Sequence, residues 1–172
     1  MFQKSKFDLE NFYNRGIIVD TNLLILFLVG KYDIDYISKF KITYKYSIED
    51  FEILRDFVVK FKKIIITPHI LAELSNLSMK ITENRLKEYF KYFIEILKKS
   101  DEINIDKNSI LLSKYVDKIG ITDVGIMLAS ENDDFLFITD DIKLAYISLS
   151  KGLSVLHFSQ IRGGYIWFKK LM

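Results

Sequence analysis

The sequence predicts an α/β fold in which helices cover both faces of a central, mostly parallel sheet, giving three α/β/α layers. Short apolar runs rich in β-branched residues alternate along the chain with longer segments that have helical periodicity. These runs are continuously apolar, which is typical of strands that are covered on both faces. The two patterns together favour a parallel sheet built from strand–helix–strand units.

The first elements are an apolar strand, an apolar helix and an amphipathic helix. Residues 17–19 predict a buried strand, and residues 23–29 predict a buried helix with Gly30 as its C-terminal stop. A second helix is expected to start at Ser47, three residues before Asp50, because this spacing is typical of a capping box.

The middle of the chain predicts a second strand at 64–67, followed by two helices. Thr67 is suited to be the N-cap, and Pro68 the first helical residue, of a helix over 68–80. Residues 82–100 predict a long helix whose apolar side chains share one face: Leu86, Phe90, Phe93, Ile94 and Leu97.

The last third of the chain continues the alternation. In order, we expect a short strand at 103–105, a helix at 109–120, a helix at 123–130, a strand at 135–139, a helix at 142–152 and a strand at 153–158. Thr122 is the expected cap of the helix at 123–130, and Gly152 the expected end of the helix before the final strand.

The chain is expected to form one domain over residues 1–172, because no repeat or Pro/Gly-rich linker divides it. It has no Cys, which excludes thiol catalysis, Cys-ligated zinc and disulfides. A net charge of +2 neither requires nor excludes a nucleic-acid partner. The N-terminal residues do not resemble a secretory leader, and the longest apolar run is far shorter than the ~20 residues of a membrane span. We therefore expect a soluble cytoplasmic protein with no membrane partner.

Acidic residues stand where the predicted strands end. Asp20 follows the strand at 17–19, and Asp140 and Asp141 follow the strand at 135–139. In open α/β sheets, ligands bind in the crevice outside the carboxyl ends of the strands. Glu73 and Asp123 lie in helices that follow loops, and they are candidates for the same crevice.

Each acid also has a structural interpretation. Asp20, Asp140 or Asp141 can cap the helix that follows it, and Asp123 in a first helical turn gains roughly 0.3–1 kcal/mol from the helix dipole. Glu73 is harder to explain in this way, because it lies on the apolar face of its helix beside residues three and four positions away.

Convergence of the acids would require cations. Two carboxylates ~5 Å apart repel each other by roughly 3 kcal/mol at an effective dielectric constant of 20. Oxygen ligands without His or Cys favour Mg²⁺ or Mn²⁺. Gly125, two residues after Asp123, removes a side chain where a helix must pack closely or leave room.

Four segments, "IIVDTNLL", "TPHILAEL", "ITDVGIMLAS" and "FITDDIKLA", resemble in this order the acidic motifs of PIN-domain nucleases. The similarity covers about residues 16–158. It implies a PIN-like fold in which Asp20, Glu73, Asp123 and Asp141 are catalytic and bind the metal. Asp140 is an alternative or assistant to Asp141, and the resemblance implies that Asn22 and Thr139 support the acids.

The resemblance implies a Mg²⁺- or Mn²⁺-dependent endoribonuclease that cleaves single-stranded or looped RNA, similar to toxin-like PIN-domain ribonucleases. An antitoxin protein and a second copy of the chain in a homodimer are the partners that it implies; RNA-maturation nucleases are the alternative within the family. The apolar segment "IRGGYIWF", with Trp167 and Phe168, is a candidate for the dimer contact or for completing the core.

The chain departs from compact toxin-like members between Asp20 and Glu73, which are 53 positions apart. We expect an elaborated helical segment at about 31–63. Its tyrosines and lysines either pack this segment on the sheet or form a lip for substrate, where rings stack on bases and lysines meet phosphates: Tyr32, Tyr36, Tyr44 and Tyr46 are the rings concerned.

Other functions have weaker support in the sequence. Asn22 stands where haloacid-dehalogenase-type phosphatases need a second acid, and no Gly-rich nucleotide motif is present. His69 and His157 are interpreted as structural. The main alternative is a catalytically inactive PIN-like module that binds RNA or a protein, although inactive relatives usually lose acids that this chain keeps.

Overall fold

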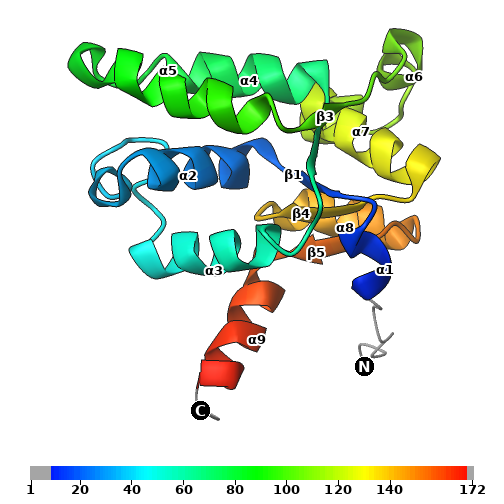
Figure 1. The fold of residues 1–172 in the computed structure, drawn as a ribbon. Coiled ribbons are helices and arrows are strands. Elements are labelled where there is room, and N and C mark those ends of the chain that lie inside the picture. The colour runs from blue at the N-terminus through cyan, green and yellow to red at the C-terminus, as the bar shows by residue number, and fades with distance from the viewer. Residues whose placement is uncertain (1–8, 170–172) are drawn as a thin grey trace.

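The computed structural model describes residues 9–169, with side chains described as far as Gly164. Five parallel strands form one sheet in the order β3-β2-β1-β4-β5 (Figure 1). The strands are β1 (Ile17–Val19), β2 (Ile64–Ile66), β3 (Asp101–Glu102), β4 (Leu136–Thr139) and β5 (Val155–His157). The predicted α/β class is therefore confirmed.

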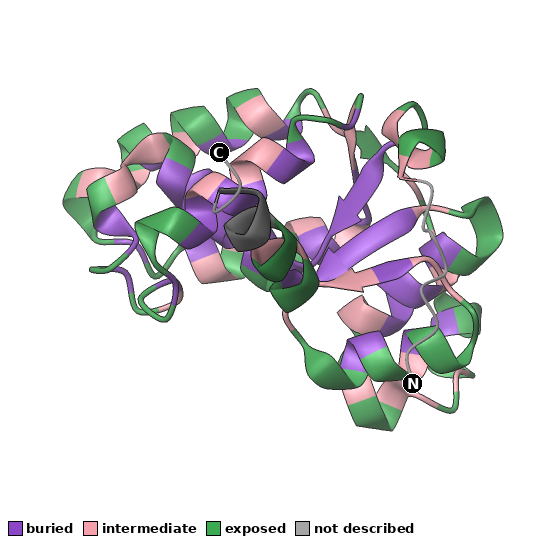
Figure 2. Ribbon diagram, turned by 90° about the horizontal axis from the view of Figure 1, so that it is seen from below, coloured by how far each residue is buried: buried purple, intermediate pink, exposed green. Residues whose placement is uncertain are grey.

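Helices lie on both sides of the sheet, which gives a three-layer α/β/α arrangement (Figures 1 and 2). One side carries α2 (Thr21–Tyr32), α3 (Ile48–Val58), α4 (Pro68–Ser78) and α5 (Glu83–Leu97), and the other carries α7 (Val116–Asp133) and α8 (Ile142–Ser150). The remaining elements are α1 (Glu10–Tyr13), the 3-10 turn η1 (Ile34–Tyr36), α6 (Lys107–Leu111) and α9 (Phe158–Lys169). No helix in the described range is long and apolar enough to cross a membrane.

Helix α2 is the central helix of the core. Every residue from Leu23 to Gly30 is buried, because the helix is enclosed by the sheet and by α3, α4 and α5. A helix that is apolar on all sides is expected in such a position. Its N-terminus, next to the end of β1, is thereby held firmly in place.

The predicted helix starts are confirmed where a side chain caps the helix. Ser47 and Asp50 form the capping box at the start of α3. The Thr67 hydroxyl accepts a hydrogen bond from the Ile70 amide at 3.2 Å, and Pro68 is the first residue of α4. These contacts join residues only three positions apart, which is why local sequence reveals them.

The prediction that Gly30 ends α2 is wrong. The helix continues to Tyr32, and Gly30 lies beneath the aromatic ring of Phe51 in α3. A Cβ atom at this position would lie 2.2 Å from the Phe51 Cδ2 atom. Gly30 is therefore required for the close approach of two helices.

The predicted apolar face of α5 is partly wrong. Ile94 is 53% exposed, whereas Tyr89 is completely buried. The Tyr89 hydroxyl shares a 2.9 Å hydrogen bond with Ser78 Oγ in α4, so its polar atom is satisfied inside the core.

The region between β2 and β4 also differs from its predicted elements. β3 lies at Asp101–Glu102 instead of 103–105, because it is an exposed edge strand without an apolar pattern. The helix predicted at 109–120 is divided into α6 and the start of α7. Gly120, with φ 86°, then bends α7, so the helix resumes before Thr122 and this residue is not its cap. Farther on, the expected helix stop at Gly152 is confirmed: Ser150 is the last helical residue of α8, and Gly152, with φ 75°, follows the C-cap Lys151 and donates its amide to the Leu149 carbonyl at 3.0 Å.

Candidate functional site

The strand order reverses direction between β1 and β4, which pair directly. In open α/β sheets this switch point leaves a crevice outside the carboxyl ends of the two strands. Asp20 follows β1, while Asp140 and Asp141 follow Thr139 at the end of β4. Three of the predicted acids are thus brought to one edge of the sheet by the topology alone.

Asp20 is buried, and its carboxylate joins the start of α2 to the residue that follows β4. Its Oδ1 accepts a hydrogen bond from the Leu23 amide at 2.9 Å, which confirms that it caps α2. Its Oδ2 accepts one from the Asp140 amide at 3.0 Å, and the Thr139 hydroxyl also hydrogen-bonds this carboxylate. Burial, and then the charge of Asp140, raise the pKa of Asp20 to about 7 despite these hydrogen bonds.

Asp123 lies in the electrostatic field of all the other acids. It is half-buried in the turn that follows the bend at Gly120. Burial raises its pKa to about 7, and the charges of four neighbours add to the shift, in decreasing order Asp20, Asp141, Glu73 and Asp140. No hydrogen bond to its carboxylate is found within residues 9–169. Asp123 is therefore the acid on which the charges of all the other predicted acids act.

Glu73 extends from α4 toward the start of α2. Its Oε2 accepts a hydrogen bond from the Thr21 hydroxyl at 3.1 Å, and Thr21 directly follows Asp20. This contact accounts for an acid on a helix face that otherwise carries the buried Ile70 and the half-buried Leu77. No sequence pattern favoured Thr21 over Asn22 as a supporting residue, yet the Asn22 side chain is exposed and Thr21 makes the contact.

Asp141 is exposed and caps α8. Its Oδ1 accepts hydrogen bonds from the amides of Lys143 at 2.7 Å and Leu144 at 2.9 Å. Its own amide donates to Thr139 Oγ1 at 2.9 Å. Thr139 thus connects the Asp20 carboxylate to the backbone of Asp141.

Asp140 is bound by groups that no local pattern predicted. Its Oδ2 accepts hydrogen bonds from Lys45 Nζ at 2.7 Å and from the Tyr46 hydroxyl. Its carbonyl oxygen accepts one from His157 Nε2 at 3.1 Å, while Ser159 bonds the other ring nitrogen. Burial and the hydrogen bond to Asp140 raise the pKa of Tyr46. Lys45 is 95 positions from Asp140, so this contact exists only in the folded chain.

The segment between α2 and α4 packs on the domain and also reaches the acids. Tyr36 and Tyr46 are each 6% exposed, so their rings belong to the core, whereas Tyr44 is 67% exposed. The packing interpretation of the segment is correct for Tyr36. Tyr46 combines a buried ring with a hydroxyl that reaches the site.

The helices α4 and α7 meet beside the acids. His69 Nδ1 is buried without a hydrogen-bond partner among the described residues. A Cβ atom on Gly125 would lie 3.7 Å from this nitrogen, an ordinary contact distance. An alanine side chain would therefore fit beside His69, so this contact requires neither of the two roles expected for Gly125.

The residue types at this edge fit a hard divalent cation. All five acids offer oxygen ligands, and their mutual repulsion favours a bound positive charge. Within the described residues, however, no three acidic or His side chains are arranged so that they could hold one metal ion in the conformation shown. The acids share an electrostatic field, and a common coordination sphere would require their side chains to rotate toward one another.

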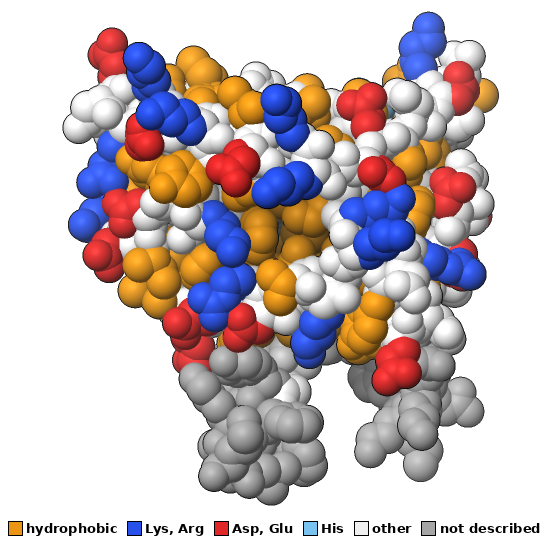
Figure 3. All heavy atoms as spheres, in the orientation of Figure 1, with side chains coloured by type: hydrophobic (Ala, Val, Ile, Leu, Met, Phe, Trp, Pro, Cys, Tyr) orange, Lys and Arg blue, Asp and Glu red, His pale blue; other side chains and the backbone are white. Residues whose placement is uncertain are grey.

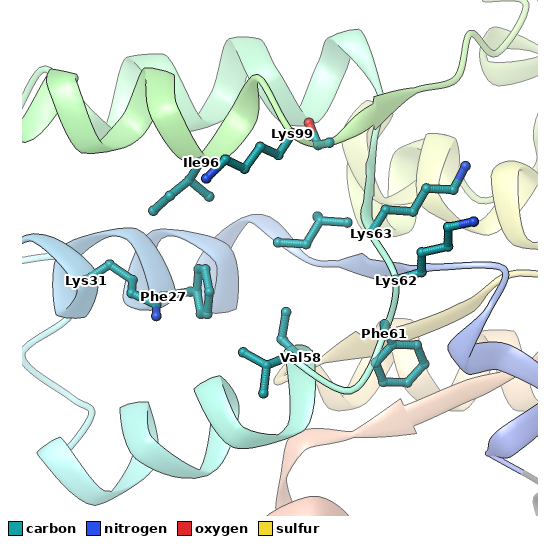
Figure 4. A pocket seen from close by; sticks show the side chains of 11 residues that line it. Phe27, Lys31, Val58, Phe61, Lys62, Lys63, Ile96 and Lys99 are labelled. Carbon is teal, nitrogen blue, oxygen red and sulfur yellow. The ribbon is translucent and has the colours of Figure 1, made fainter.

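A separate groove lies at the other end of β2, where Lys62 and Lys63 precede the strand. Figure 3 shows Lys and Arg side chains around a hollow with an apolar floor, and Figure 4 shows Phe27, Val58 and Ile96 among the residues that line the groove. Its volume is about 270 Å³. None of the predicted site residues lines it.

Comparison of the chain with models of known protein families found no match, and comparison with curated protein sequences likewise found none.

Proposed function

We propose that this protein is a Mg²⁺- or Mn²⁺-dependent nuclease with a PIN-like fold that hydrolyses RNA phosphodiesters. The observation that carries the proposal is the position of Asp123, whose carboxyl group lies in the field of Asp20, Asp141, Glu73 and Asp140 at the switch point of the sheet. A cluster of this charge is stable at neutral pH only when protons or cations neutralise it.

Asp20, Glu73, Asp123 and Asp141 would hold the metal. When bound, the ion supplies Lewis-acid activation of water and neutralises charge on the phosphodiester. The protein fixes the acids through Thr139, which hydrogen-bonds Asp20 and Asp141, and through Thr21, which hydrogen-bonds Glu73.

Asp141 is favoured over Asp140 as the fourth metal ligand. The charge of Asp141 affects Asp123 more strongly than that of Asp140 does. The Asp140 carboxylate is already neutralised by Lys45, and Tyr46 bonds the same oxygen. We assign Asp140 a positioning role, because its amide holds Asp20.

The choice of RNA over DNA, and the further proposals of a toxin with an antitoxin partner, a homodimer and a cytoplasmic location, rest on the resemblance of the four acidic motifs to PIN-domain nucleases. The side chains of Trp167 and Phe168 in the proposed dimer segment lie outside the described residues. Co-purification with an inhibitory small protein would support the toxin assignment.

A cleavage assay on a mixed pool of single-stranded and structured RNA tests the proposal. We expect cleavage with Mg²⁺ or Mn²⁺, none with EDTA, and a loss of at least a hundredfold in Asp20→Asn and Asp123→Asn. Asp117→Asn is the matched control, because Asp117 is an exposed acid on the same helix as Asp123. Circular dichroism checks that each variant is folded. Absence of metal-dependent cleavage on all substrates would favour the alternative of a module that binds RNA or protein without cutting it.

A further inference from the structure

Lys45 supplies a positive charge to an otherwise acidic edge. Lys45 Nζ pairs with Asp140 Oδ2 at 2.7 Å. Within the described residues, no other ion pair includes an acid of the site, that is, Asp20, Glu73, Asp123, Asp140 or Asp141. The Lys45 side chain is 51% exposed, whereas that of Asp140 is 15% exposed. The Lys45 ammonium group therefore bonds Asp140 on one side and faces solvent on the other.

Tyr46 holds Lys45 in this position. The Lys45 ammonium lies over the Tyr46 ring, 4.8 Å from its centroid, and both side chains bond the same oxygen of Asp140. The Tyr46 ring is buried and cannot swing away. Because a cation is attracted to the face of an aromatic ring, the two contacts restrain the lysine together.

The backbone that carries Lys45 is itself well anchored. The Thr43 hydroxyl donates to the Ile37 carbonyl at 2.8 Å, and the Tyr46 amide donates to the Thr43 carbonyl at 2.9 Å. The next residue, Ser47, caps α3, and Asp50 of that cap pairs with Arg162 of α9 at 2.8 Å. Lys45 thus projects from a fixed turn.

We propose that Lys45 binds a phosphate of the nucleic-acid substrate beside the acidic site, with Tyr46 and Asp140 as its positioning residues. An ammonium group has three donors, so it can bond Asp140 and a phosphate oxygen together. An anionic substrate that approaches five carboxylates meets repulsion, and a half-exposed cation at this edge offsets it. This inference rests on the proposed function and names the residue that contacts the substrate backbone.

The test compares Lys45→Met with Lys62→Met. The control removes the same charge from an exposed lysine at the groove, which lies at the opposite end of the sheet from the acids. Cleavage of a fluorescent single-stranded RNA is measured over a range of KCl concentrations. Lys45→Met is expected to raise KM about tenfold, as for loss of one charge-assisted hydrogen bond. The slope of log(1/KM) against log[KCl] should become shallower by about 0.7, the value for one lost phosphate contact.

Lys45→Arg keeps the charge and should restore KM to within about threefold of wild type. Tyr46→Phe keeps the ring and should have an intermediate KM. For a readout that does not depend on turnover, binding of the same RNA to Asp123→Asn is compared by fluorescence anisotropy with and without Lys45→Met, and we expect the same tenfold weakening.

Three results would overturn the inference. Lys45→Met could match Lys62→Met in KM and salt slope, it could lower kcat alone with KM unchanged, or it could leave RNA binding intact in the Asp123→Asn background. The proposed function fails separately, when wild-type protein cleaves no RNA with any divalent metal, and the inference then fails with it.

Discussion

At the scale of single residues, the site is defined by two carboxyl groups that burial and neighbouring acids make hard to ionise. The pKa values of Asp20 and Asp123 are both raised to about 7 from an ordinary value near 3.8. Between these two pH values the folded chain binds more protons than the unfolded chain. The free energy of unfolding must therefore decrease as the pH rises from about 4 to 7, as far as these two groups determine it.

Replacing Asp123 by Asn should stabilise the protein at pH 8 in the absence of metal. The neutral amide removes a buried charge and its repulsion with four acids, and we expect a gain on the order of 2 kcal/mol in the free energy of unfolding. At pH 4 the gain should nearly vanish, because the wild-type group is then protonated. Urea denaturation of both proteins at the two pH values measures the difference. A gain of equal size at both values, or an equal effect of the control Asp117→Asn, would contradict this explanation.

At the scale of elements, the site depends on how closely α2 and α3 pack, because α2 begins at Asp20 and α3 follows the turn that carries Lys45. Gly30 allows this packing by leaving space for the Phe51 ring. The capping box at Ser47 fixes where α3 begins. A change in this helix pair is expected to affect both stability and the position of Lys45.

Gly30→Ala should therefore destabilise the protein, although alanine favours helices. The added Cβ would overlap the Phe51 ring, and overpacking of this kind costs roughly 1–3 kcal/mol. Gly163→Ala in α9 is the matched control, since its Cβ would meet no atom of the described residues within 4 Å. The control should be neutral or gain up to about 1 kcal/mol from helix propensity. Thermal unfolding of the two variants decides the matter, and equal melting temperatures would contradict the packing argument.

At the scale of the whole molecule, the acids come from separate parts of the chain. Asp20 caps α2, Glu73 lies in α4, Asp123 in α7, and Asp141 caps α8. These helices lie on both sides of the sheet. A cation bound by all four acids would connect the layers and stabilise the fold as a unit.

Mg²⁺ or Mn²⁺ should accordingly raise the melting temperature at pH 8. A ligand at a hundred times its dissociation constant stabilises the state that binds it by about 2.7 kcal/mol. The increase should be largely lost in Asp123→Asn and retained in Asp117→Asn. Differential scanning fluorimetry over a range of metal concentrations measures it. An equal increase in both variants would indicate that the metal binds elsewhere.

Local patterns in the sequence predicted the features that depend on neighbouring residues. Continuous apolar runs predicted strands at 17–19, 64–67 and 135–139, each within one residue of β1, β2 and β4, and the caps at Ser47 and Thr67 identified helix starts. The placement of Asp20 after one strand and of Asp140 and Asp141 after another followed directly. Because parallel strands end at one edge of a sheet, their meeting was predictable as soon as the fold class was.

The folded structure alone determined which distant side chains meet. The bonds of Lys45 and Tyr46 to Asp140, the burial of Tyr89 in place of Ile94, and the position of Gly30 under Phe51 all depend on the path of the chain between elements. The sequence by itself determined the apolar strands β1, β2, β4 and β5, the main helix starts and the order of the acids, since these arise from apolar burial and hydrogen bonds over a few residues. Only the tertiary structure decided which acid is neutralised by a lysine, because charges interact through space irrespective of their separation along the chain.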